Sequence, residues 1–236
     1  MKERTILVVI PVREEHRELL EEAAPGNRFV YSSIKEVSRE QVQEADIILG
    51  NVPADKIGAS KKLEWLQLNS AGADAYAGEG ILDKNTVVTT SNGAYGKTVS
   101  EHMFAMLLAM QKKLHLYRDS QNKHIWDEHG TVTSIADSTV LIFGMGDIGR
   151  HFAKMAHALG AYVIGVKKNP GNCPEYIDEP HLMKDCRELL PHADVVVSFF
   201  PITSETRGLF NKEMFHLMKP GAFFLNGGRG DAVCTE

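Results

Sequence analysis

The chain has 236 residues, of which 43% are hydrophobic and 24% charged, and its formal net charge is −5. Its length suits one large domain or two ordinary ones, and its composition is that of a folded protein. The acidic balance argues against nucleic acid as a partner, and no apolar run reaches the ~18 residues that cross a bilayer. Three cysteines without metal-ligand spacing, and an N-terminus unlike a signal peptide, indicate reduced thiols in a cytoplasmic protein.

The first hundred residues alternate short apolar runs with amphipathic stretches. Strands are predicted at residues 6–10, 29–31, 46–50, 63–68 and 86–90, and helices at residues 16–24 and 39–45. This alternation is the βαβ rhythm of a parallel sheet covered on both faces.

A long helix is predicted over residues 98–118, because this stretch has no Gly or Pro and is strongly apolar on one side. Residues 119–137 are polar and expected to be irregular. Beyond them, strands are predicted at residues 139–143, 162–166, 195–200 and 222–225, and helices at residues 148–159, 182–190 and 212–218. The predicted fold class is α/β, with two doubly wound parallel-sheet units that meet near residue 100, where the long helix crosses between them.

A glycine-rich turn follows the strand at 139–143, in the stretch "VLIFGMGDIGR". Gly144, Gly146 and Gly149 stand in the order G-x-G-x-x-G between a β-branched strand and a helix, which is the context that indicates dinucleotide binding. The first glycine allows a tight turn, the second lets the backbone approach a pyrophosphate, and the third lets the helix pack against the strand. The alternative is a glycine-rich turn without a ligand.

Two lysines stand where a dinucleotide fold usually carries an acidic residue, at the end of the second strand. The position 18 residues after Gly149 is Lys167, and Lys168 follows it. A carboxylate would repel a ribose 2′-phosphate, whereas two ammonium groups attract one. We therefore expect NADP(H) to be preferred, with NAD(H) possible. The alternative is that both lysines only solvate the end of a strand.

Five stretches together carry a family resemblance: "NSAGAD" (69–74), "VSEHMFAMLLAM" (99–110), "VLIFGMGDIGR" (140–150), "ADVVVSFFPITSETRGLFN" (193–211) and "MKPGAFFLNGGRG" (218–230). In this order they resemble the D-isomer-specific 2-hydroxyacid dehydrogenases. The resemblance implies a flavodoxin-like substrate domain over residues 1–100 and a Rossmann-type dinucleotide-binding domain over 101–236. It implies hydride transfer between NAD(P)H and a small 2-oxo acid or D-2-hydroxy acid, with glyoxylate or hydroxypyruvate as the expected substrate. It also implies a homodimer built around the cofactor domain and its long helix.

The resemblance assigns Arg229 as the catalytic arginine, whose N–H donors would bind the substrate carboxylate and polarise the 2-oxo carbonyl. Ser70, Ala71 and Gly72 would hold the same carboxylate through backbone N–H groups. The remaining cofactor contacts that the resemblance implies are Asp147 and Ile148 at the pyrophosphate, Pro201 and Thr206 along the nucleotide, and Asn226, Gly227 and Gly228 near the nicotinamide. The alternatives are a surface arginine and a plain turn after a strand.

The family also needs a histidine as proton donor and a glutamate to orient it, both well after the arginine. None of the ten histidines has that position, and the sequence stops at Glu236. We therefore expect a C-terminally truncated member with little or no dehydrogenase activity as the chain stands. The alternative from another class is a non-catalytic dinucleotide-binding or redox-sensing module. A methyltransferase would share the glycine-rich turn but would not explain Arg229.

Overall fold

A computed structural model describes residues 3–169 and 171–235 of the chain. It divides into two compact units, of which the first ends at Ala94 and the second begins at Tyr95. This division lies shortly before residue 100, so that the helix which follows belongs to the second unit.

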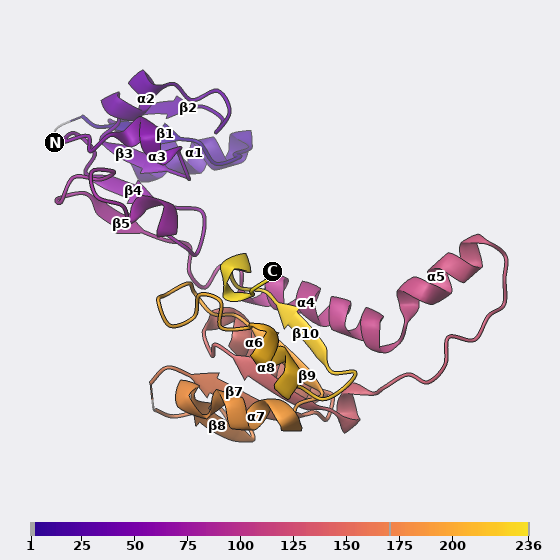
Figure 1. The fold of residues 1–236 in the computed structure, drawn as a ribbon. Coiled ribbons are helices and arrows are strands. Elements are labelled where there is room, and N and C mark those ends of the chain that lie inside the picture. The colour runs from indigo at the N-terminus through magenta and orange to yellow at the C-terminus, as the bar shows by residue number, and fades with distance from the viewer. Residues whose placement is uncertain (1–2, 170, 236) are drawn as a thin grey trace. The chain divides into compact units, whose positions relative to one another are not determined.

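The first unit is a five-stranded parallel sheet in the order β2-β1-β3-β4-β5 (Figure 1). The strands are β1 Thr5–Val8, β2 Arg28–Tyr31, β3 Ile47–Leu49, β4 Trp65–Gln67 and β5 Val87–Thr89, and the connections hold α1 Glu14–Ala23, α2 Arg39–Glu44, α3 Ala54–Ile57 and the 3-10 turn η1 Asp74–Tyr76. This strand order is that of flavodoxin-like folds, in which the winding direction reverses between the first and third strands.

The second unit is also a five-stranded parallel sheet, in the order β10-β9-β6-β7-β8. Its strands are β6 Thr139–Phe143, β7 Tyr162–Lys167, β8 Glu179–Leu182, β9 Val195–Ser198 and β10 Phe223–Asn226. Its helices are α4 Gly96–Gln111, α5 Leu114–Asn122, α6 Asp147–Ala158, α7 Cys186–Leu189 and α8 Lys212–Leu217, with 3-10 turns η2 Ile135–Asp137, η3 Met183–Asp185, η4 Leu190–His192 and η5 Gly230–Ala232. Counted from β6, the order is the 3-2-1-4-5 of Rossmann folds, so the predicted fold class is confirmed.

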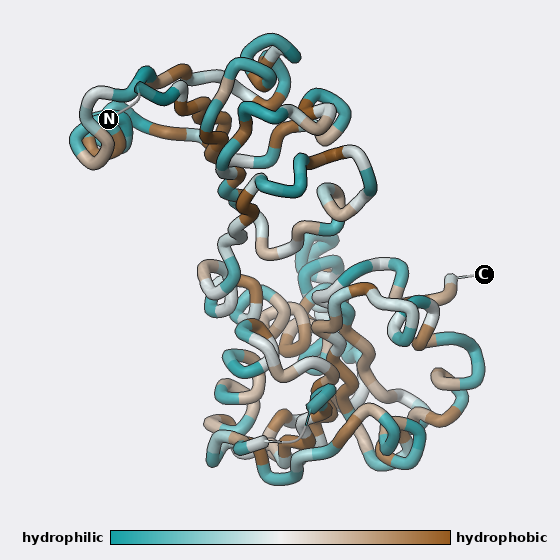
Figure 2. Tube along the Cα trace, turned by 90° about the vertical axis from the view of Figure 1, so that its left-hand side faces the viewer, coloured by the Kyte–Doolittle hydropathy of each residue, from teal (hydrophilic) through white to brown (hydrophobic). Residues whose placement is uncertain are grey.

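In the second unit, successive strand residues point to opposite faces of the sheet and pack into two separate hydrophobic cores. Val140 and Ile142 of β6 pack with α4 and α6 on one face, where Phe104 and Phe152 meet edge to face at 5.1 Å. Leu141 and Phe143 pack on the other face against side chains of α7 and α8. In Figure 2, hydrophobic stretches of the chain run through the interior of each unit, and hydrophilic stretches lie mostly around them. A sheet covered on both faces leaves its carboxyl edge as the place where ligands can approach.

Two predicted elements are wrong in part. The helix predicted over 98–118 is broken, because Lys113 takes a left-handed conformation (φ 54°) between α4 and α5. The Nζ atoms of Lys112 and Lys113 donate to the carbonyls of Thr133 and His129, contacts that a local pattern does not reveal. The helix predicted over 182–190 contains the end of β8 and the turn η3 before α7 begins.

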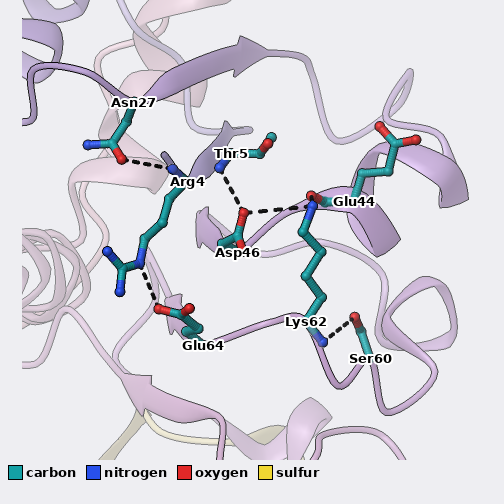
Figure 3. A network of polar contacts seen from close by, with 8 residues as sticks. All are labelled: Arg4, Thr5, Asn27, Glu44, Asp46, Ser60, Lys62 and Glu64. Atoms are coloured by element: carbon teal, nitrogen blue, oxygen red, sulfur yellow. Dashed lines mark hydrogen bonds and ion pairs between the residues drawn. The ribbon is translucent and has the colours of Figure 1, made fainter. Parts of the chain in front are cut away.

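In both sheets, an aspartate before one strand accepts a hydrogen bond from the first N–H of the neighbouring strand. Each pair lies at the amino edge, at the point where the winding of the sheet reverses. In the first unit, the buried Asp46 precedes β3 and accepts a 2.8 Å hydrogen bond from the Thr5 N–H of β1, as Figure 3 shows. Lys62 Nζ lies 3.7 Å from the same carboxylate. In the second unit, Asp194 precedes β9 and accepts from the Thr139 N–H at 2.8 Å.

The lysine partner is closer in the second unit, where Lys219 Nζ lies 2.9 Å from the Asp194 carboxylate. Burial acts to raise the pKa of Asp194, but the bonds from Lys219 and Thr139 outweigh it and hold that pKa below its ordinary value. The sequences "ADIIL" (45–49) and "ADVVV" (193–197) therefore serve equivalent positions in two differently wound sheets.

Candidate functional site

The glycine-rich turn joins β6 to α6, and the protein itself requires glycine at the first and third of its three glycine positions. Gly144 has φ 95°, a conformation that residues with a side chain rarely adopt. A Cβ atom on Gly149 would lie 2.0 Å from the Gly144 carbonyl oxygen, so only glycine lets the helix sit this close to the turn. A Cβ atom on Gly146 would meet nothing within 4 Å, so this glycine fills no packing need of the protein.

The start of α6 is arranged to receive an anion. Gly146 is its N-cap residue and is solvent-exposed, and within the part of the chain that the structure describes no side chain caps this helix start. The first N–H groups of a helix lack intrahelical acceptors and carry the positive end of the helix dipole. The turn therefore fits the pyrophosphate of a dinucleotide, with Asp147 and Ile148 supplying the first N–H groups.

The ends of β9 and β10 lie beside this turn. The Cβ position of Gly144 is 3.0 Å from the Phe199 carbonyl carbon, and that of Gly227 is 2.7 Å from the Phe199 ring. The Cβ position of Gly228 is 2.6 Å from the Phe200 carbonyl oxygen. Three strand ends thus meet at the carboxyl edge, and Gly144, Gly227 and Gly228, all predicted as cofactor residues, come together there.

Two predicted cofactor residues, Thr206 in the loop after β9 and Asn226 at the end of β10, form hydrogen bonds with the backbone of their own loops. Thr206 is buried, and its hydroxyl donates to the Pro201 carbonyl at 2.7 Å. The Asn226 side chain accepts from the Gly228 N–H at 3.1 Å and donates to the Arg229 carbonyl at 3.0 Å. The Thr206 hydroxyl therefore holds the backbone of the loop after β9, and the Asn226 amide holds that of the loop after β10. Arg229, in the second of these loops, is exposed.

The two predicted specificity lysines lie at the end of β7 on the same carboxyl edge. Lys167 is half-buried and donates through Nζ to the Gly171 carbonyl of the following loop. Lys168 is exposed, and its Nζ lies 3.9 Å from the Glu205 carboxylate. An exposed ion pair of that length is weak, so it leaves Lys168 accessible to a stronger anion.

The predicted substrate loop belongs to the first unit and follows β4, at the carboxyl edge of that sheet. Ser70 Oγ donates to the Gly72 carbonyl at 2.7 Å and accepts from Asn51 Nδ2 at 2.9 Å. Asn51 also accepts from the Asn69 N–H at 3.0 Å. Sequence reasoning missed Asn51, although a polar residue directly after a predicted strand at the same edge could have indicated it.

The structure supplies two further observations that bear on partners. Within residues 3–169 and 171–235, no group of three His, Cys, Asp or Glu side chains could hold a metal ion. In the same described residues, every helix is too short or too polar to span a membrane.

Comparison with known proteins agrees with the fold and the turn. A sequence model of the family described as "D-isomer specific 2-hydroxyacid dehydrogenase, NAD binding domain" matches residues 104–236. A solved D-isomer specific 2-hydroxyacid dehydrogenase family protein from Aeromonas salmonicida is 31% identical, with a TM-score of 0.87 over 99% of this chain and 76% of that one. The chain belongs to the D-isomer specific 2-hydroxyacid dehydrogenase family.

Curated relatives in this family carry different substrates in their names. A D-3-phosphoglycerate dehydrogenase of Methanocaldococcus jannaschii is 27% identical over 97% of this chain and 44% of its own length. A glycerate dehydrogenase of Methylorubrum extorquens is 27% identical over 82% of this chain and 62% of its own length. The chain therefore spans less than two thirds of the length of these relatives.

Proposed function

We propose that this chain provides the nicotinamide-dinucleotide site and the substrate contacts of a reductase for small 2-oxo acids. The observation that carries the proposal is the turn at Gly146, which leaves open space beside an uncapped helix start. Family membership supports the same function, since the matched family model is that of a NAD-binding domain. The cofactor would supply the hydride, and the protein would orient both reactants and bind the charge of the acid.

NADP(H) is the cofactor we propose, on the strength of Lys167 and Lys168 at the end of β7. A hydrogen bond to a charged group contributes roughly 1.5–3 kcal/mol, which is about ten- to a hundredfold in affinity. Calorimetric titration of the chain with NADPH and NADH tests the preference. Lys167→Asp should reverse it, because the new carboxylate accepts a ribose 2′-hydroxyl and repels a 2′-phosphate. Equal affinities of the unaltered chain for both cofactors would contradict the assignment.

For the substrate we propose a 2-oxo acid of the glyoxylate or hydroxypyruvate type. Arg229 would bind its carboxylate and polarise its carbonyl, and the N–H groups of Ser70, Ala71 and Gly72 would bind the carboxylate. Glyoxylate should bind to the NADPH-loaded chain in calorimetry, whereas the neutral acetaldehyde should not. Arg229→Lys keeps the charge but loses the planar fork, and we expect it to lower the affinity for glyoxylate about tenfold. A chain that binds NADPH but no oxo acid would instead fit a dinucleotide-binding module without catalysis.

A second copy of this chain is the partner we propose. Figure 1 shows α5 and the segment after it standing out from the body of the second unit. This arm exposes the large apolar side chains Leu114, Leu116, Tyr117, Ile125 and Trp126, and the Trp126 side chain is 99% exposed. Residues 112–129 hold four Lys or Arg and three Asp or Glu, a near balance that suits contact with an identical arm.

A further inference from the structure

A pocket of about 520 Å³ opens directly beside the glycine-rich turn, on the outer face of α6. It is lined by Gly146, Asp147, Arg150, His151, Lys154 and Tyr176. Arg150, His151 and Lys154 come from one exposed helical face, at spacings of one, three and four residues, so up to three cationic groups border the same space. None of these three belongs to the residues that the sequence predicted for the cofactor.

Arg150 is tied to the turn itself. Its Nε donates to the carbonyl oxygen of Met145 at 3.1 Å, and Met145 stands between the first two glycines of the turn. A guanidinium has five N–H donors, and this bond uses one of them. The bond fixes where the planar fork lies while leaving donors that can bind an anion.

Met145 also connects Arg150 with the end of β7. Its sulfur lies 3.1 Å from the Cβ position of Gly165, so the Met145 side chain covers that glycine. Gly165 and Lys167 lie two residues apart in β7, and therefore on the same face of the sheet. Met145 is thus contacted by Arg150 from α6, and it covers the same face of β7 on which Lys167 lies two residues after Gly165.

The adenosine ribose of a dinucleotide binds at the end of this second strand, with its pyrophosphate on the glycine-rich turn. A 2′-phosphate on that ribose would therefore face the space between the turn and the end of β7. The Asp147 carboxylate borders the pocket as well, but it is turned toward the start of α4, where it lies 2.3 Å from the Cβ position of Gly96, and His151 Nε2 lies 3.7 Å from it.

We propose that Arg150 is a specificity-determining residue that binds the adenosine 2′-phosphate of NADP(H) together with Lys167. The inference rests on the proposed dinucleotide function and adds to it a cation from the helix side of the turn. Its planar fork can make two parallel bonds to one phosphate group, which an ammonium group cannot do. Lys154, farther along α6, contributes charge to the same pocket.

Calorimetry with 2′,5′-ADP and 5′-AMP isolates the 2′-phosphate, because these two probes differ only in that group. Arg150→Gln should lower the affinity for 2′,5′-ADP and for NADPH about ten- to a hundredfold. The affinities for 5′-AMP and NADH should change less than about twofold. Arg187→Gln is the matched control, because it removes an exposed arginine of α7 in the same unit that pairs with Glu213 of α8. It should leave the affinities for all four ligands unchanged. Arg150 is exposed, so thermal unfolding of Arg150→Gln should match that of the unaltered chain.

Equal weakening of NADPH and NADH by Arg150→Gln would place the arginine on the pyrophosphate and overturn the inference. Unchanged affinity for 2′,5′-ADP would overturn it as well. Failure of the proposed function has a different signature, since the unaltered chain would then bind neither dinucleotide, and the role of Arg150 would fall with it.

Discussion

Replacing Gly149 or Gly146 by alanine should separate folding from ligand binding within one short turn. In Gly149→Ala, the new Cβ would lie 2.0 Å from the Gly144 carbonyl oxygen, whereas a carbon–oxygen contact normally needs about 3.3 Å. The obstacle is backbone, so α6 must move away from the turn. Overpacking of this kind costs about 1–3 kcal/mol and sometimes more, and we expect about 3 kcal/mol here. For a chain of this size that lowers the midpoint of thermal unfolding by roughly 6–12 °C.

Gly146→Ala makes the same chemical change three residues earlier in the chain, with the opposite expectation. Its Cβ meets nothing within 4 Å, and the backbone at φ −78° accepts alanine. Loss of a good N-cap residue is offset by a less flexible unfolded chain, so stability should change by no more than about 0.5 kcal/mol. Affinity for NADPH should fall at least about tenfold, because the methyl group occupies the space where the pyrophosphate approaches. Circular dichroism melts and calorimetry on both variants are the measurements. NADPH binding by Gly146→Ala as tight as that of the unaltered chain would refute the reasoning.

Three further outcomes are expected. Trp126→Ser should shift the chain from dimer to monomer in analytical ultracentrifugation, whereas Leu19→Ser, which alters an exposed leucine of the first unit, should not; a monomeric unaltered chain would contradict the arm as an interface. The hydrogen bond with Glu179 raises the pKa of His181 against the effect of burial, and the bond with His181 likewise lowers the pKa of Glu179. The stabilisation from His181 is complete below its ordinary pKa of 6.5 and disappears as pH rises through the raised value, and that from Glu179 is complete above 4.5 and is lost on acidification. The free energy of unfolding should therefore differ most between the unaltered chain and His181→Gln from pH 4.5 to 6.5, and a difference that grows toward pH 9 would be the wrong sign. Asn51→Ala should lower stability by about 1–3 kcal/mol in urea unfolding and weaken glyoxylate binding, since it removes two hydrogen bonds that hold the predicted substrate loop; unchanged glyoxylate affinity would show that the loop is positioned without it.

Most strands could be predicted because a buried parallel strand is a short β-branched run, and such runs are visible one at a time. β8 was missed because it is an edge strand with the sequence Glu-Pro-His-Leu, which has no apolar pattern. The break between α4 and α5 was missed for a different reason. Lys113 is an ordinary helix former, and the bond that goes with its left-handed conformation comes from residues beyond α5.

In the candidate site too, features that depend on a local stretch of sequence could be predicted, and those that depend on contacts between distant segments were missed. The glycine-rich turn could be predicted because all three of its glycines lie within the six residues 144–149. Asn51 was missed although it directly follows a predicted strand, because its role as a partner of Ser70 and Asn69 depends on β3 and β4 ending side by side. Arg150 also escaped prediction, since an arginine after the last glycine of the turn is unremarkable until its Nε is seen on the Met145 carbonyl.

The aspartates that precede β3 and β9 have a consequence for how the two sheets open. Strand ends usually exchange their amide hydrogens fast, because terminal residues fray. Thr5 and Thr139 are the first residues of their strands, yet each N–H is bonded to an aspartate carboxylate. Their exchange should therefore be slow, and slower at Thr5, since the Asp46 side chain is 3% exposed and that of Asp194 is 39% exposed. Because these bonds hold the amino ends of β1 and β6, we expect both strands to open first at their carboxyl ends, at the edge where the glycine-rich turn and the predicted substrate loop lie.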